Sequence, residues 1–156
     1  MEKTLVLLKP DAVQRGLAGR IIARFEQKGI RLAALKMLTI GQPLARRMYA
    51  VHEGKDFYEP LVRFVTAGPL VAMVLEGRDV VAVARRMMGP TFGPDAPPGT
   101  IRGDFGMSRR YNLVHGSDSA ESAAREIALF FAPEEIQPYN PPTEQWIYAR
   151  SGDELI

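Results

Sequence analysis

Two histidines are the residues of this chain best suited to nucleophilic chemistry at neutral pH. The sequence contains no cysteine, which excludes a thiolate nucleophile, a disulfide framework and a cysteine-ligated metal. Imidazole titrates near about pH 6.5, so its neutral, nucleophilic form is abundant at pH 7. His52 precedes Glu53, but the second histidine of a zinc-protease helix is missing, and a histidine-built metal site is not expected.

His115 has the more suggestive surroundings of the two histidines. It belongs to the segment NLVHGSDS at 112–119, where a short strand is expected to end and a polar helix start follows. Gly116 leaves space beside the ring, and Ser117 and Asp118 supply polar partners. A lone histidine is more often structural, and a glycine beside it can equally be an ordinary turn residue. The context nevertheless makes His115 the candidate nucleophile.

The usual phosphate-binding motifs are absent from the sequence. Gly54-Lys55 is followed by Asp56, and Tyr49 stands where a Walker A motif would begin with glycine. No GxGxxG pattern occurs. An Asp-Phe-Gly triplet at 104–106 imitates a protein-kinase motif, but the companion motifs of a protein kinase are missing upstream. Phosphate chemistry would therefore depend on separate cationic side chains.

The hydrophobic pattern predicts alternating strands and helices. The expected elements are a strand at 4–8, a helix ending near Gly29, a strand at 30–40, two short helices between 43 and 66, a strand at 70–75, a helix at 80–88 and a strand near 112–114. The last helix is expected to begin near Asp118 in a capping box with Glu121, with Ala120, Ala123, Ala124, Ile127 and Phe131 on one face. This order predicts an α+β, ferredoxin-like (split βαβ) fold, a four-stranded antiparallel sheet with helices packed on it.

Length and composition favour one domain. The chain of 156 residues is 46% hydrophobic and 24% charged, which is ordinary for a globular protein, and no linker or internal repeat is visible. We expect a single domain over 1–156, with 132–156 as a proline-rich C-terminal tail. The proline-rich stretch at 90–99 is expected to be a long, shaped loop, and loops of this kind are often functional.

Charge and hydropathy narrow the classes of partner. The net charge of +2 is spread over interspersed acidic and basic residues, so the signal for nucleic-acid binding is weak. The longest uncharged stretch, between Arg63 and Glu76, is shorter than the about 20 residues that cross a bilayer. The apolar run at 5–8 is too short for a signal peptide. We expect a cytoplasmic protein with no membrane span.

Three segments resemble the nucleoside diphosphate kinase family. They are LKPDAVQRG at 8–16, PGTIRGDF at 98–105 and NLVHGSDS at 112–119, and the resemblance runs in uninterrupted order from Thr4 to Tyr148. It implies reversible transfer of the γ-phosphoryl group from a nucleoside triphosphate, typically ATP, to a nucleoside diphosphate. The implied mechanism is ping-pong, through a phosphohistidine at His115.

The resemblance also implies roles for further residues. Glu126 would hold the far nitrogen of the His115 ring, and Ser117 would support that carboxylate. Arg85, Arg102 and Thr91 would bind the phosphates, Lys9 and Asn112 the sugar hydroxyls, Phe57 would stack on the base, and Tyr49 would lie near the transferring phosphate. Replacing either arginine would weaken transfer while leaving folding almost intact. Mg²⁺ would arrive with the nucleotide, bridged by waters to Asp118 at most.

Several of these residues also have an ordinary structural interpretation. Glu126 can equally be a solvated helix flank and Arg85 an exposed arginine, while Phe57 and Tyr49 belong to a class that is more often found in the core. A nucleic-acid-binding or regulatory module that keeps the fold is the main rival function, supported only by the pI and the arginine content. A nucleotide-binding scaffold that cannot react is a second rival, although it would be expected to lack the histidine.

The chain departs from the family pattern in two places. Phe92-Gly93 replaces the usual Asn-Pro after Thr91, which puts the shape and subunit contacts of the loop in doubt. Arg110-Tyr111 replaces the usual Gly-Arg, and Arg109 stands where an apolar base-clamping residue often lies. The resemblance implies a homo-oligomer, either a tetramer or a hexamer, with the 90–99 loop as a typical subunit contact.

Overall fold

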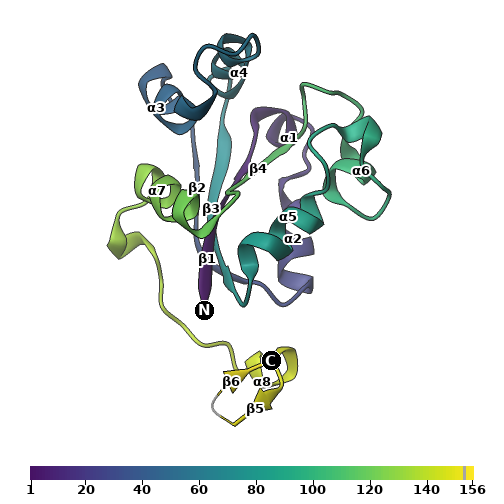
Figure 1. Cartoon of the computed structure of the whole chain (residues 1–156), viewed down its shortest axis with the longest axis vertical. Coiled ribbons are helices and arrows are strands. Elements are labelled where there is room, and N and C mark those ends of the chain that lie inside the picture. The colour runs from purple at the N-terminus through teal and green to yellow at the C-terminus, as the bar shows by residue number, and fades with distance from the viewer. Residues whose placement is uncertain (153) are drawn as a thin grey trace.

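A four-stranded antiparallel sheet forms the centre of the fold (Figure 1). The structure is a computed structural model that describes residues 1–152 and 154–156. The strands are β1 (Glu2–Leu8), β2 (Arg31–Leu38), β3 (Leu70–Gly77) and β4 (Val114–Gly116), in the spatial order β2-β3-β1-β4. Every neighbouring pair is antiparallel, which confirms the predicted ferredoxin-like sheet.

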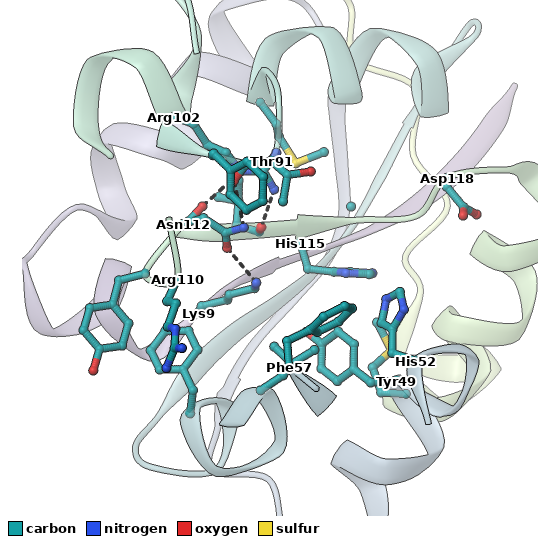
Figure 2. A pocket seen from close by; sticks show the side chains of 18 of the residues that line it. Lys9, Tyr49, His52, Phe57, Thr91, Arg102, Arg110, Asn112, His115 and Asp118 are labelled. Atoms are coloured by element: carbon teal, nitrogen blue, oxygen red, sulfur yellow. Dashed lines mark hydrogen bonds between the residues drawn. The ribbon is translucent and has the colours of Figure 1, made fainter. Parts of the chain in front are cut away.

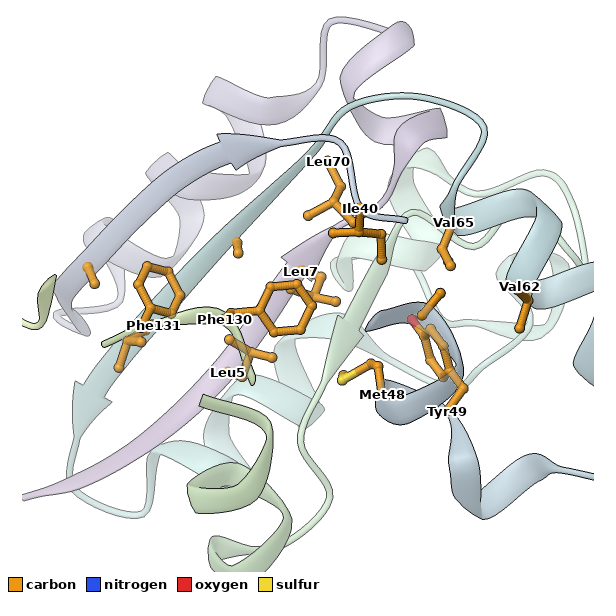
Figure 3. Packing of buried hydrophobic residues seen from close by; sticks show 14 of the residues in the cluster. Leu5, Leu7, Ile40, Met48, Tyr49, Val62, Val65, Leu70, Phe130 and Phe131 are labelled. Carbon is orange, nitrogen blue, oxygen red and sulfur yellow. The ribbon is translucent and has the colours of Figure 1, made fainter. Parts of the chain in front are cut away.

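The two central strands bury both of their faces. Every residue of β3 is buried, as the unbroken apolar run at 70–75 predicts. Successive side chains point to opposite faces, so Leu5 and Leu7 of β1 pack in one cluster and Val6 and Leu8 in another. Figure 3 shows the first cluster, where Phe130 lies close to Leu5 and Leu7.

Helices cover both faces of the sheet. One face is covered by α3 (Gln42–Met48), α4 (Tyr58–Val65) and α7 (Ala120–Phe130). The other is covered by α1 (Pro10–Gln14), α2 (Ala18–Gln27), α5 (Val80–Met88) and α6 (Ile101–Phe105). Short 3-10 turns span Ala50–His52, Gly93–Asp95 and Pro133–Glu135. The sequence pattern missed α1 and α6 because five residues are too few to show a helical period.

Three expected details near the site are wrong. The N-cap of α7 is Ser119, whose hydroxyl accepts the Ser122 N–H at 3.0 Å, and not Asp118 in a capping box with Glu121. The buried residues of α7 are Ala123, Glu126 and Phe130, so the buried face differs from the apolar stripe drawn from the sequence. The last strand starts at Val114 and not near Asn112, because Leu113 has a positive φ of 69° that no strand accommodates.

The C-terminal segment leaves the end of α7 and finishes beyond the N-terminal end of β1 (Figure 1). It contains α8 (Glu144–Ile147) and a small hairpin of β5 (Arg150–Ser151) and β6 (Glu154–Leu155). The Gln137 N–H donates to the Ala33 carbonyl at 2.8 Å, and the Arg78 N–H donates to the Tyr148 hydroxyl at 3.1 Å. In the part of the chain that the structure describes, no helix has both the length and the apolar character needed to cross a membrane.

Replacing Ser119 by alanine should lower the free energy of unfolding by about 1 kcal/mol, because the helix loses its side-chain cap. Ser119→Asp keeps an acceptor at the N-cap and should stay near the wild type. Urea denaturation of both variants and of Asp118→Ala measures the difference. A larger loss for Asp118→Ala than for Ser119→Ala would contradict the cap assigned here.

Candidate active site

A cavity of about 1040 Å³ collects nearly all the site residues predicted from the sequence (Figure 2). It is lined by residues of α3, α4, α5, α6, α7 and β4, by Lys9 after β1, and by residues of the connecting segments. The predicted residues on its wall are Lys9, Tyr49, Phe57, Arg85, Thr91, Arg102, Asn112, His115, Asp118 and Glu126. Ser117 does not line it, but its hydroxyl contacts Glu126.

His115 is held by a chain of hydrogen bonds that leads into the sheet. Its Nε2 lies 2.9 Å from Oε2 of Glu126, which also accepts from the Ser117 hydroxyl at 2.7 Å. The Leu5 N–H of β1 donates to the same hydroxyl at 3.3 Å. Because an ionised carboxylate can only accept, Nε2 carries the ring proton and Nδ1 keeps its lone pair. Nδ1 is therefore the ring atom that is available to act as a nucleophile.

The protonation states of this pair suit a nucleophile. Burial lowers the pKa of His115 below its usual value and outweighs the hydrogen bond to Glu126, which acts in the opposite direction. Burial alone would raise the pKa of Glu126, but its hydrogen bonds to His115 and Ser117 bring that pKa below the usual value. At neutral pH the imidazole is consequently neutral while the carboxylate is charged.

A left-handed turn at Leu113 connects Asn112 to the strand that carries His115. The Val114 N–H donates to the Asn112 carbonyl at 2.8 Å, across Leu113 with its φ of 69°. Such a conformation costs a branched residue about 1 to 3 kcal/mol unless its surroundings hold it. Here Oδ2 of Asp11 accepts the Leu113 N–H at 3.0 Å, and the Lys9 N–H donates to the Leu113 carbonyl at 2.8 Å. The turn is thus fixed from α1 and from the end of β1.

Arg102 is buried and is bound to backbone carbonyls from two other segments. Its Nε donates to Asn112 at 3.1 Å, Nη2 donates to Val114 at 2.7 Å, and Nη1 donates to Gly89 at 2.7 Å. Burial and the neighbouring Arg85 lower the pKa of Arg102 to about 10, so it is still charged at pH 7. One N–H of Nη2 has no protein acceptor among these bonds and can serve a ligand.

Arg85 lies on the same cavity but in different surroundings. It is exposed, and its contact within the described chain is a long hydrogen bond from Nη1 to the Gly116 carbonyl at 3.4 Å. Its guanidinium can therefore reorient toward an anion at little cost. The two arginines, equivalent in the sequence argument, thus differ in how much of the fold depends on them.

Lys9 and Asn112 meet although 103 positions separate them in the sequence. The Lys9 ammonium donates to Oδ1 of Asn112 at 2.7 Å, and Nδ2 of Asn112 donates to the Thr91 carbonyl at 3.0 Å. Burial, with a contribution from the charge of Arg102, lowers the pKa of Lys9 to about 8. The pair predicted to bind the sugar is thus assembled, and its lysine loses its proton more easily than an exposed one.

The two predicted aromatic residues lie at different depths. Phe57 is half exposed, whereas Tyr49 is buried in the core and meets the His115 ring edge-on at 5.7 Å between centroids. The Tyr49 hydroxyl has no hydrogen-bond partner among the described residues, and burial raises the pKa of Tyr49, so it stays neutral. The sequence left open whether Tyr49 belongs to the core or to the site. In the structure Tyr49 is buried in the core and also lines the cavity.

The sequence argument missed His52, which also lines the cavity. Its ring lies 6.4 Å from that of Tyr49 and 5.2 Å from that of Phe57. His52 was set aside because it belongs to no metal-binding motif. One feature of the sequence could have pointed to His52: it lies between Tyr49 and Phe57, the two aromatic residues predicted for the site, on one short segment.

Residues 109–111, which depart from the family pattern where a base-clamping residue is expected, are held in place by contacts of their side chains. Arg109 lies over the ring of Phe92 at 5.0 Å and pairs with Asp95 at 3.1 Å. Tyr111 packs against Phe64 with 4.9 Å between centroids. The residues that depart from the family pattern therefore form one wall of the cavity mouth.

The described part of the chain holds no protein metal cluster at the cavity. In residues 1–152 and 154–156, no group of three or more His, Cys, Asp or Glu side chains could hold a metal ion. Asp118 is exposed on the cavity wall, and a hydrogen bond from Ser122 is the main cause that lowers the pKa of its carboxyl group. Asp118 can therefore offer a charged oxygen to a cation that is held mainly by another ligand.

Comparison with protein families decides the relationship. The family model described as "Nucleoside diphosphate kinase" matches residues 2–136. The chain belongs to the nucleoside diphosphate kinase family. A nucleoside diphosphate kinase of Desulfitobacterium hafniense is 55% identical over 147 residues, which cover 94% of this chain and 99% of that protein. One from Thermus thermophilus is 60% identical over 136 residues, 87% of this chain and 99% of that protein.

Solved structures of the family share the fold over almost the whole chain. A halophilic nucleoside diphosphate kinase from Halobacterium salinarum, solved in complex with CDP, is 46% identical with a TM-score of 0.92. The match covers 94% of this chain and 98% of that one. A family member from Babesia bovis is 42% identical with a TM-score of 0.91, over 95% of this chain and 100% of that one.

The contrast between Arg102 and Arg85 predicts unequal effects on folding. Arg102→Ala would leave buried carbonyl groups without donors and should lower the free energy of unfolding by roughly 3 kcal/mol. Arg85→Ala is the matched control and should change it by less than about 0.5 kcal/mol. Chemical denaturation checks both values, and equal losses would show that the carbonyl bonds of Arg102 do not support the fold.

Proposed function

We propose that the chain catalyses reversible transfer of the γ-phosphoryl group from a nucleoside triphosphate, typically ATP, to a nucleoside diphosphate. The observation that carries this proposal is the His115 ring, fixed through Nε2 by Glu126 and placed in a cavity lined by Lys9, Arg85 and Arg102. Donor and acceptor would use the same cavity in turn. The reaction would thus be ping-pong, with phospho-His115 between the two halves.

In the first half-reaction Nδ1 of His115 attacks the γ-phosphorus. The N–P bond forms while the bond from phosphorus to the β,γ-bridging oxygen breaks, and that oxygen keeps the electron pair as the diphosphate leaves. The ring gains positive charge as the new bond forms, so the hydrogen bond from Nε2 to Glu126 becomes stronger. Ser117 keeps the carboxylate in place. The second half-reaction is the reverse, with the acceptor diphosphate as attacking group.

The cationic side chains would stabilise the charge that gathers on the transferring group. Phosphoryl transfer depends chiefly on positioning and on positive charge at the equatorial oxygens. A pair of unit charges about 4 Å apart is worth about 4 kcal/mol at an effective dielectric constant of 20. Arg85 and the free N–H of Arg102 would bind the phosphates together with Thr91. Tyr49, whose ring meets that of His115 edge-on, would lie near the transferring group.

The sugar and the base would bind nearer the mouth of the cavity. Lys9 and Asn112 would hold the ribose hydroxyls, and Phe57 offers a half-exposed ring on which a base can stack. Stacking without hydrogen bonds to the base edges tolerates every base. The Halobacterium salinarum relative was solved with CDP, which supports binding of a pyrimidine nucleotide in this cavity.

Mg²⁺ would be bound with the nucleotide. Because Glu126 is engaged by His115 and Ser117, the ionised Asp118 is the acidic residue of the site that remains to meet a hydrated ion. The metal would take most of its ligands from phosphate oxygens and waters. When bound, it supplies further positive charge to the phosphates.

We also propose that the chain forms a homo-oligomer, a tetramer or a hexamer. Strand β2 is an edge of the sheet, and its Leu35 and Met37 side chains are exposed. An edge strand with exposed apolar side chains is suited to association with another chain.

A nucleic-acid role has less support, because Arg24, Arg46 and Arg109 are each paired with a carboxylate and so do not form a free basic stripe.

Incubation with γ-labelled ATP tests the proposed chemistry. The wild type should acquire a label that is stable in base and lost in acid, because an N–P bond is hydrolysed in acid. His115→Asn should acquire none. Glu126→Gln should be labelled about 10-fold to 100-fold more slowly, since a charge-assisted hydrogen bond is lost. Turnover of His115→Asn at the wild-type rate would overturn the assignment.

The pH dependence of kcat/KM should be bell-shaped. On the acid side it should fall only at a pH below the usual titration range of histidine, because burial lowers the pKa of His115 and protonation removes the lone pair of its ring. On the basic side it should fall above about pH 8, because Lys9 loses its charge. Steady-state rates from about pH 5 to about pH 9 measure both limbs. Lys9→Gln should lower kcat/KM and remove the basic limb, and a basic limb unchanged in this variant would exclude Lys9 as its cause.

A further inference from the structure

Four aromatic rings connect the mouth of the cavity to its reactive histidine. Phe57 meets His52 at 5.2 Å with 60° between the ring planes, and His52 stacks on Tyr49 at 6.4 Å and 22°. Tyr49 in turn meets His115 edge-on at 5.7 Å. Figure 2 shows the His52 ring beside those of Tyr49 and Phe57. His52 is thus the contact between an exposed ring and a buried one.

Phe57 needs a support of this kind. Its side chain is half exposed and precedes the first residue of α4, so the helix itself does not fix its rotamer. An exposed ring that changes rotamer loses entropy when a base stacks on it, and this entropy is subtracted from the binding free energy. A neighbouring ring that is itself fixed removes part of this cost. Tyr49, with an exposed fraction of 4%, gives His52 such a fixed surface.

Lys55 completes the arrangement from the solvent side. Its ammonium lies 3.2 Å from Nδ1 of His52 and 5.7 Å from the centre of the Phe57 ring. An ammonium can only donate, so Nδ1 of His52 is the acceptor and the imidazole ring is neutral. Burial, and then the charge of Lys55, lower the pKa of His52, in agreement with this assignment. His52 is thus held on both sides, by Tyr49 and by Lys55.

We propose that His52 is a positioning residue that holds the Phe57 ring ready to stack on the nucleobase. This inference rests on the proposed function, because it takes a nucleotide as the ligand of the cavity. His52 acts by the contact of its ring with Phe57, so its effect falls on binding of the base and not on phosphoryl transfer. It applies to every nucleobase, since stacking does not read the base edges.

Binding of ADP and of pyrophosphate provides the test, because pyrophosphate has no base. His52→Ala should weaken ADP binding by about threefold to tenfold, a part of the value of one base stack. Inhibition by pyrophosphate should be unchanged. The KM for nucleotides should rise by a similar factor while kcat changes by less than about twofold. A loss of pyrophosphate affinity equal to that of ADP, or a change confined to kcat, would overturn the proposal.

Two substitutions separate the ring from its nitrogen atoms. His52→Phe keeps an aromatic ring between Phe57 and Tyr49 and should retain ADP affinity within about twofold of the wild type. His52→Gln keeps polar atoms but no ring and should resemble His52→Ala. Melting temperatures of all variants identify any that is simply less stable. Failure of the phenylalanine variant to restore affinity in a protein of normal stability would overturn the role of the ring.

A double-mutant cycle tests whether His52 acts through Phe57. Once Phe57→Ala has removed the stacking surface, adding His52→Ala should weaken ADP binding no further. Additive losses would show that His52 acts independently and would overturn the proposal. A wild type that bound no ADP and acquired no label from ATP would instead contradict the proposed function itself, so the two failures are distinguishable.

Discussion

The buried guanidinium of Arg102 joins the segments on which the candidate site depends. From α6 it donates to the carbonyl at the end of α5, Gly89, and to both sides of the left-handed turn, Asn112 and Val114. That turn places the Asn112 side chain on Lys9 and leads directly into the strand of His115. A single charged group thereby connects the Lys9–Asn112 pair to the strand that carries His115.

Burying Lys9 and Arg102 costs free energy, because it holds positive charge away from water. Burial is the main cause that lowers the pKa values of Lys9 and Arg102, and the charge of a neighbouring arginine adds to it: Arg102 for Lys9 and Arg85 for Arg102. An anionic ligand relieves that repulsion, so the charge that is unfavourable in the free protein becomes favourable when phosphate is bound. Ligands that bind only the folded state also stabilise it. Stability and affinity are therefore coupled at this site.

The hydrophobic core and the site are continuous at α3 and α4. Tyr49 belongs to the cluster that packs under Phe130 and also contacts His115, so the packing of the core fixes one wall of the cavity (Figure 3). Glu126 is a buried position of α7 in the same way, and its carboxylate is paired with His115 and Ser117. A sequence pattern assigns such residues either to the core or to the solvent. The hydrophobic pattern alone could therefore not identify residues that belong to the core and line the cavity as well.

The sequence by itself predicted the four-stranded sheet and the helix at 80–88, which the structure confirms, and it singled out His115 as the candidate nucleophile. These follow from local periodicity and from the absence of cysteine, which each segment shows without reference to any other. Only the tertiary structure decided that Arg102 is buried while Arg85 is exposed, that Leu113 is left-handed and that His52 belongs to the site. These outcomes depend on contacts between distant segments, such as Lys9 with Asn112, and the period of a helix or strand carries no information about which distant side chain will meet it.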